Sequence, residues 1–169
     1  MSPIPETVTF AVIAVATITA AVIDVRTRRV PNALTMSLAL VGLALAVAGL
    51  GRVGIGASIA GCLVGLALML PGHLLGATGG GDVKLLAAVG TLLGPGATLR
   101  AFVATAIAGG LIAMVVAVRR GRFAATLAGT SALVTSVGSE IAQLRDPQHD
   151  NRFAYAPAIA IGAIVAAVF

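Results

Sequence analysis

The sequence predicts an all-α protein, a polytopic membrane helical bundle, and three observations support this. Hydrophobic residues make up 59% of the 169 positions and charged residues only 10%, whereas soluble domains carry about a quarter charged residues. The apolar residues form long uncharged runs, and a spanning helix needs about 20 mostly apolar residues. Helices also satisfy their own backbone hydrogen bonds in lipid. We therefore expect a single membrane-embedded domain over residues 1–169.

Six uncharged runs predict about six transmembrane helices, taken in chain order: Thr7–Ile23, Ala33–Leu50, Val53–Gly72, Leu85–Leu99, Ala101–Val118 and Phe153–Phe169. The first run is preceded by no basic residue, so it is expected to be a retained span rather than a cleaved signal peptide. Residues 123–144 carry a polar stripe at helical spacing, which is typical of a helix lying in the interface. We expect one amphipathic helix here on the cytoplasmic side, with a seventh span as the alternative.

The basic residues predict the orientation of the bundle. With the N-terminus outside, the predicted threading brings nine of the eleven Lys and Arg residues to the cytoplasmic side: Arg26, Arg28, Arg29, Lys84, Arg119, Arg120, Arg122, Arg145 and Arg152. Short cytoplasmic loops collect such residues, so this orientation is preferred. Because the charges lie in short clusters between apolar runs, a lipid bilayer is the expected partner, and nucleic acid is not.

Six acidic residues exist, and elimination leaves two as site candidates. Glu6 lies at the outer end of the first span, Glu140 on the amphipathic stripe, and two others in a polar loop. Asp24 and Asp82 each lie at the inner end of an apolar run, where a carboxylate is costly. Two carboxylates that share a site keep one proton between them, and such a pair can activate water without a metal ion or cofactor.

Other interpretations of these two residues stay open at this point. Asp24 would pair with Arg26 or Arg28, and Asp82 would cap the helix that follows it. A small ion- or proton-coupled transporter would also use two membrane carboxylates, although it predicts acids near the bilayer midplane. The chain has one cysteine, Cys62, so a disulfide within the chain and a cysteine-based zinc site are excluded.

The residues around the two aspartates carry a family resemblance. Asp24 opens an Asp-x-Arg segment that leads to Pro31 and Asn32, and Asp82 ends the run Gly-Gly-Gly-Asp at 79–82. Together they resemble the signature regions of the type IV prepilin leader peptidases, which are GxGD membrane aspartyl proteases. The segment 155–162 resembles that family's final-span motif. The resemblance implies that Asp24 and Asp82 are catalytic, supported by these motif residues: Gly79, Gly81, Lys84, Arg26, Pro31 and Asn32.

The resemblance also implies an activity. Such an enzyme removes the short leader of a prepilin-like membrane protein at the cytoplasmic face, in a bacterial-type cytoplasmic (inner) membrane. The short first loop and the lone Cys62 resemble the short members that serve tight-adherence (Flp-type) pili, so N-methyltransferase activity is not expected. The family motif does not call for His73, which is expected to be an ordinary interface residue. The oligomeric state is left open.

Overall fold

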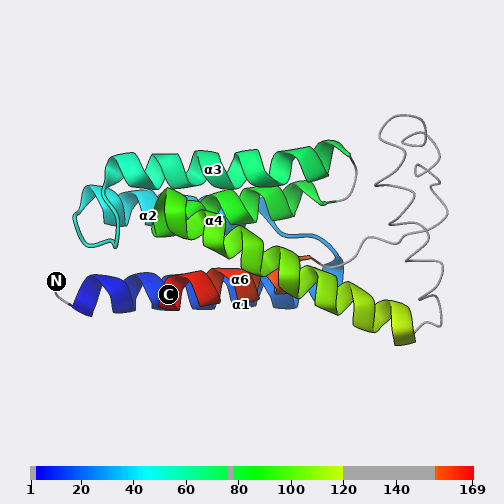
Figure 1. Ribbon diagram of the computed structural model, residues 1–169. Helices are drawn as coiled ribbons and strands as arrows, with labels where there is room; N and C mark the ends of the chain where they lie inside the picture. The colour runs from blue at the N-terminus through cyan, green and yellow to red at the C-terminus, as the bar shows by residue number, and fades with distance from the viewer. Residues whose placement is uncertain (1–2, 76–77, 120–154) are drawn as a thin grey trace.

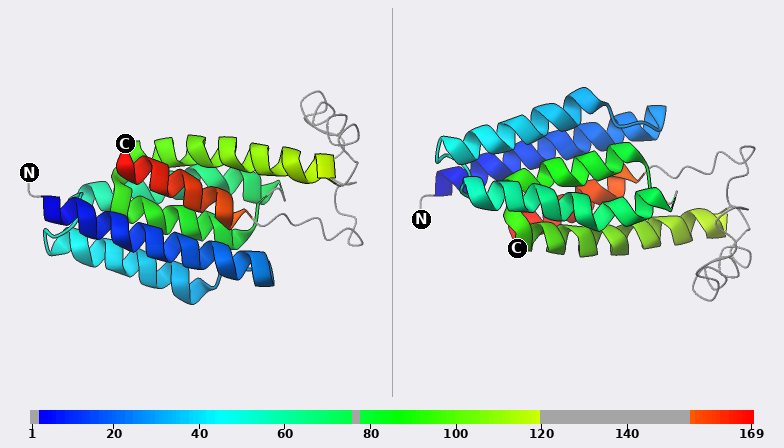
Figure 2. Two further views of the ribbon diagram at one scale, coloured as in Figure 1. Left: turned by 90° about the horizontal axis from the view of Figure 1, so that it is seen from below. Right: turned by 90° about the horizontal axis from the view of Figure 1, so that it is seen from above.

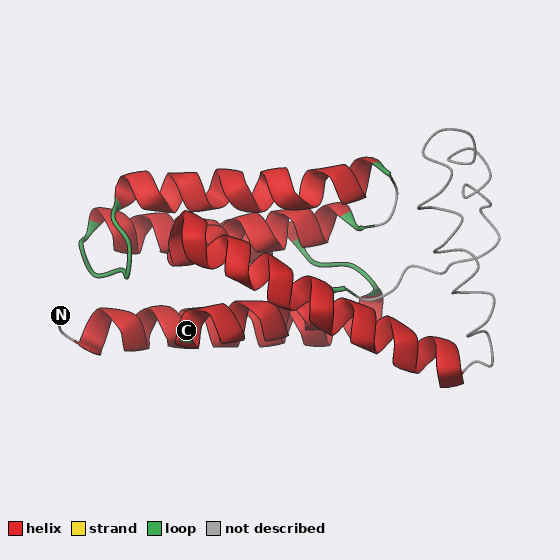
Figure 3. Ribbon diagram, viewed as in Figure 1, coloured by secondary structure: helices red, strands yellow, loops and turns green. Residues whose placement is uncertain are grey.

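The computed structural model describes residues 3–75, 78–119 and 155–169, and within these ranges every regular element is a helix (Figure 3). The elements are α1 (Pro3–Thr27), α2 (Asn32–Val47), α3 (Ile55–Leu74), α4 (Gly80–Arg119) and α6 (Ala156–Val168). They lie side by side with roughly parallel axes (Figure 1). The predicted all-α bundle is confirmed for this part of the chain. The predicted amphipathic helix at 123–144 lies outside the described residues.

The long helix α4 is two antiparallel arms joined at Gly94. This residue has φ 75° and ψ 173°, which is not helical, and a positive φ is readily available only to glycine. Pro95 follows and lacks the N–H that a continuous helix would use. Both views in Figure 2 show the chain turning back here. The first arm covers residues 80–93 and the second 95–119, so the predicted run Leu85–Leu99 is divided between the two arms.

The outer surface of the bundle suits a lipid environment. By length and composition three helices are apolar enough to cross a membrane, namely Pro5–Thr27, Ile55–Leu74 and Gly80–Val116, and the turn at Gly94 divides the last of these into two arms. Helices α2 and α6 are apolar but shorter, with 16 and 13 residues. Large apolar side chains point outward, such as Val15 and Leu63, which in water would be an aggregation hazard. The chain is therefore described as a membrane protein, while the count of six spans stays a prediction.

Small residues hold α3 against the first arm of α4. A Cβ on Gly61 would collide with the backbone of Gly90, and a Cβ on Gly65 would lie 2.8 Å from the Leu86 carbonyl oxygen. Such close approach is typical of membrane helices, which associate by van der Waals packing rather than by exclusion of water. The seam leads directly to the start of α4, so it provides a firm support for the residues there.

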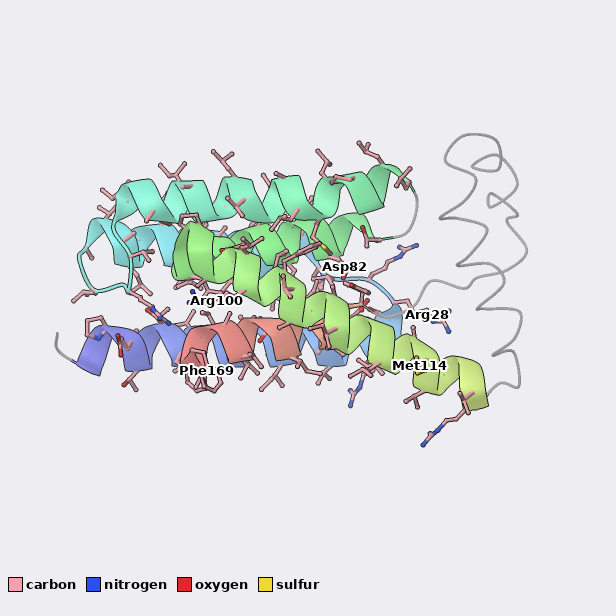
Figure 4. The ribbon with its side chains drawn as sticks, viewed as in Figure 1. Arg28, Asp82, Arg100, Met114 and Phe169 are labelled. Carbon is pink, nitrogen blue, oxygen red and sulfur yellow. The ribbon has the colours of Figure 1, made fainter. Side chains whose placement is uncertain are left out.

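The helix ends divide between two ends of the bundle. The end of α1 and the starts of α2, α4 and α6 lie together, while the chain turns at Gly94 at the other end (Figure 1). The Arg52 side chain donates a hydrogen bond of 2.9 Å to the Ala167 carbonyl and so fastens the loop before α3 to the last turn of α6. Arg28 and Arg100 lie toward opposite ends (Figure 4).

Candidate active site

Asp24 lies on the buried face of α1. This face carries Ile13, Thr17, Ala20 and Asp24 at spacings of three and four residues, and only 5% of the Asp24 surface is exposed. Its Oδ2 accepts a hydrogen bond of 3.1 Å from the backbone N–H of Ala156, 132 residues away. Ala156 begins α6, and the first N–H groups of a helix have no partner within the helix and favour negative charge. The start of α6 therefore stabilises the Asp24 carboxylate.

Asp82 lies in the first turn of α4 and is only 7% exposed. Its Oδ2 accepts a hydrogen bond of 3.2 Å from the backbone N–H of Gly79, the residue just before the helix. This is the acidic half of a capping box, in which the third helical residue reaches back to the N-cap. The capping role considered from the sequence is therefore real, but it occupies one oxygen. Oδ1 of Asp82 is buried and has no hydrogen-bond partner among the described residues.

The two carboxyl groups lie close enough to interact electrostatically, although 58 positions separate them in sequence. The Tyr155 side chain, immediately before α6, is also within electrostatic range of Asp82. Figure 4 shows Asp82 at the end of the bundle where the α1–α2 turn passes. Two buried carboxylates at such proximity repel each other when both are charged. The arrangement suits a pair in which one carboxyl group is charged while the other keeps its proton.

The glycines before Asp82 allow close approach of neighbouring groups. A Cβ on Gly79 would lie 3.0 Å from Oδ2 of Asp82, and a Cβ on Gly81 would lie 3.0 Å from Cβ of Val30. Neither glycine has the positive φ found at Gly49 and Gly94 in the described residues. These two glycines are therefore needed because they leave room for neighbouring groups, not because the backbone is left-handed there.

The turn between α1 and α2 reaches the start of α4 by two contacts. Val30 packs against Gly81, and the Lys84 ammonium donates a hydrogen bond of 2.9 Å to Oδ1 of Asn32. Pro31 is the N-cap residue of α2, with extended backbone at φ −63° and ψ 135°. Asn32 begins the helix, so the Pro-Asn pair aims the amide of Asn32 at α4.

A model of the type IV leader peptidase family matches residues 11–114. This is more than half of the chain. The chain belongs to the type IV leader peptidase family. The matched range contains both aspartates, the Pro-Asn pair and Lys84, and it ends before Tyr155. Searches of curated proteins and of solved structures found no match.

Most of the residues predicted from the motifs meet at one end of this leader peptidase. Gly79 and Gly81 lie next to Asp82, and Lys84 and Asn32 form a hydrogen bond with each other one turn further on. Arg26 is different, because its side chain is exposed and Asp24 faces α6. No group of three or more His, Cys, Asp or Glu residues that could hold a metal ion occurs in ranges 3–75, 78–119 and 155–169.

Sequence reasoning missed two supports of this leader peptidase site. One is the backbone N–H of Ala156, which binds Asp24. The segment 155–162 resembled a family motif, but the resemblance did not indicate this contact. The other is His73, whose Nδ1 lies 3.0 Å from the Thr78 carbonyl oxygen and whose ring lies beside Gly80. His73 therefore holds the loop that precedes Asp82. Its place just before the glycine-rich segment was the signal that could have drawn attention to it.

Proposed function

We propose that this chain is an aspartyl endopeptidase that removes the leader from prepilin-like membrane precursors, with Asp24 and Asp82 as its catalytic residues. The observation that carries the proposal is that Oδ1 of Asp82 is buried and has no hydrogen-bond partner among the described residues. The same carboxyl group is within electrostatic range of that of Asp24, which is also buried. Family membership supports the peptidase reaction. The start of α6 supports the charge on Asp24.

In the proposed reaction, the charged Asp24 carboxylate accepts a proton from a water molecule, and the water oxygen attacks the scissile carbonyl carbon. Asp82, protonated at Oδ1, donates that proton to the leaving amide nitrogen. A C–O bond forms and the C–N bond breaks, and the pair ends with one proton, as it began. General acid and base catalysis of this kind contributes about 10²- to 10⁴-fold to the rate, and it requires no metal ion or cofactor.

The distribution of charge supports a cytoplasmic site in an inner membrane, with the N-terminus outside. Of the basic residues in the described ranges, five belong to the helix ends around the aspartates: Arg26, Arg28, Arg29, Lys84 and Arg119. Arg52 and Arg100 belong to the other end. Cytoplasmic segments carry such an excess. A prepilin-like precursor would present its leader to Asp24 and Asp82 from that side, with its own apolar helix in the bilayer.

The placement of the acids also counts against ion coupling, because both belong to helix ends rather than to helix centres near a membrane midplane. We propose no methyl transfer, since the loop between α1 and α2 is short and the free Cys62 lies within α3. The proposed enzyme therefore cleaves the leader without methylating the product, like the short members that serve tight-adherence pili.

The test compares isosteric variants in a cleavage assay with a pilin-like precursor, following loss of the leader by gel shift. Asp24→Asn and Asp82→Asn each keep an oxygen that accepts the backbone hydrogen bond but lose the titrating group. Each is expected to slow cleavage by at least about 100-fold. Glu6→Gln, which changes an exposed acid in the first turn of α1, is the matched control and is expected to leave the rate unchanged.

Cleavage by either Asn variant at the rate of the unchanged protein would contradict the assignment. Size-exclusion profiles and helical circular dichroism of all three variants should coincide with those of the parent protein. This comparison separates lost chemistry from lost folding, because the Asn variants retain the shape of both side chains.

A further inference from the structure

A groove of about 780 Å³ runs along the outside of the bundle between α1 and α2. The two helices are in sparse contact here, whereas α1 packs mainly against α6. No charged side chain lines the groove, and its lining includes Ala11, Val15, Thr19 and Ile23 of α1 and Ala33 and Leu34 of α2. It is therefore an apolar groove on the surface that faces lipid.

The groove leads to Arg26. Ala11, Val15 and Thr19 follow one another at four-residue spacing along the groove face of α1, and Arg26 lies seven residues, or two turns, beyond Thr19 on the same face. The Arg26 side chain is exposed, and so is that of Arg29 in the turn that follows. One end of the apolar groove, which we call its mouth, therefore lies beside the exposed side chains of Arg26 and Arg29.

We propose that this groove binds one acyl chain of an anionic phospholipid, with the lipid phosphate at Arg26. From Ala11 to Ile23, α1 rises by about 18 Å at about 1.5 Å per residue. That length is close to the depth of one leaflet, half of a hydrocarbon core of about 30 Å. Anionic lipid headgroups attract basic residues near the surface by about 1 kcal/mol each, and Arg pairs well with phosphate oxygens.

A substrate helix fits the groove less well than a lipid. A membrane-spanning helix is about 30 Å long, so the groove would cover little more than half of it. Asp24 also lies on the face of α1 that packs against α6, whereas Ile23 and Arg26 are on the groove side. A helix in the groove would leave its cleavage site on the wrong side of α1.

The experiment measures bound lipid by native mass spectrometry of the full chain. The protein is released from micelles that contain equal amounts of phosphatidylglycerol and phosphatidylcholine with identical acyl chains. We expect phosphatidylglycerol to bind preferentially, and Arg26→Gln to reduce that preference about fivefold, the equivalent of about 1 kcal/mol. Arg100→Gln, at the other end of the bundle, is the matched control and should keep the preference.

A second pair of variants tests the groove itself. Ala33→Phe fills the groove at an exposed position of α2 and should lower the binding of both lipids. Ala44→Phe adds the same ring to an exposed position of α2 that does not line the groove, and it should have no such effect. Lipid binding needs no peptidase activity, so the inference stands or falls independently of the proposed reaction.

Two results would overturn the inference. One is an equal lipid preference in Arg26→Gln and Arg100→Gln, because the mouth of the groove would then have no part in binding. The other is unchanged lipid binding in Ala33→Phe together with slower cleavage of a pilin-like precursor, which would assign the groove to the substrate helix instead.

Discussion

Two helix pairs in this bundle are packed in opposite ways. Helix α3 and the first arm of α4 touch backbone to backbone through Gly61 and Gly90. Helices α1 and α2 instead leave a groove of about 780 Å³ between them. Small residues occur in both pairs, but only in the first do glycines of facing helices meet. The spacing of the helices therefore depends on where the small residues lie, not on how many there are.

The difference separates the supports of the two aspartates. Asp82 begins the helix arm that is locked against α3, whereas Asp24 ends a helix that is held mainly by α6. The proposed site therefore lies where a tightly packed unit meets a more loosely packed one. Near the aspartates, three contacts cross or complete that boundary: the Ala156 N–H to Asp24, Val30 on Gly81, and Lys84 to Asn32. Changes on the tight side should affect folding, and changes at the boundary should affect activity.

The largest effect is expected for Gly61→Ala in the tight seam. The added Cβ would meet the carbonyl group of Gly90, and backbone atoms of a packed helix cannot move aside as a side chain does. Overpacking of this kind destabilises by about 1–3 kcal/mol. We expect a lower midpoint of thermal unfolding in detergent, by about 2–4 °C for each kcal/mol.

The same helix offers a matched control in Gly56→Ala. No atom lies within 4 Å of a Cβ at Gly56, and alanine is favoured over glycine in a helix by about 0.5–1 kcal/mol. This variant should unfold at the same temperature as the parent or slightly above it. Equal unfolding temperatures for the two variants would show that the seam is not close-packed and would remove the contrast between the two helix pairs.

A smaller effect, on activity rather than folding, is expected for Gly109→Ala. Its Cβ would lie 2.8 Å from Cε2 of Tyr155, so the ring must shift. Tyr155 directly precedes the N–H that binds Asp24, and misplacement of a catalytic group by about 1 Å lowers rates by up to about 100-fold. We expect roughly tenfold slower cleavage with nearly unchanged thermal unfolding.

Gly110→Ala provides the comparison for this variant, because a Cβ there has open space around it. Cleavage by Gly110→Ala should match that of the parent. If Gly109→Ala also matched the parent, the start of α6 would have no role in positioning Asp24, and the boundary would extend only to the other two contacts.

The sequence was informative wherever a pattern repeats along one segment. Uncharged runs predicted the helices of the described residues, but the predicted run Leu85–Leu99 continues past the reversal at Gly94. The motifs around Asp24 and Asp82 predicted these two residues as catalytic, and that role stays a prediction. The arrangement of partners was beyond reach, because it joins distant segments. Nothing local to Ala156 indicates that its N–H binds a residue 132 positions earlier.

Arg26 and His73 are two residues whose surroundings the sequence alone could not predict. Arg26 belongs to the Asp-x-Arg motif, yet the helical twist places it on the groove face of α1 and Asp24 on the face toward α6. His73 matched no motif, yet it contacts the loop that precedes Asp82. In both cases the role depends on which neighbour a helix face meets, and a single sequence does not contain that information.

The smallest expected effect belongs to the exposed hydrogen bond between Lys84 and Asn32, which joins α4 to α2. Hydrogen bonds to a charged group contribute about 1.5–3 kcal/mol when shielded, but exposed polar pairs contribute nearer 1 kcal/mol or less. Lys84→Met and Asn32→Ala should each slow cleavage about twofold to fivefold. The double variant should be no slower than either single one, because both remove the same contact. Independent, multiplying effects would mean that Lys84 acts elsewhere, for instance on the precursor itself.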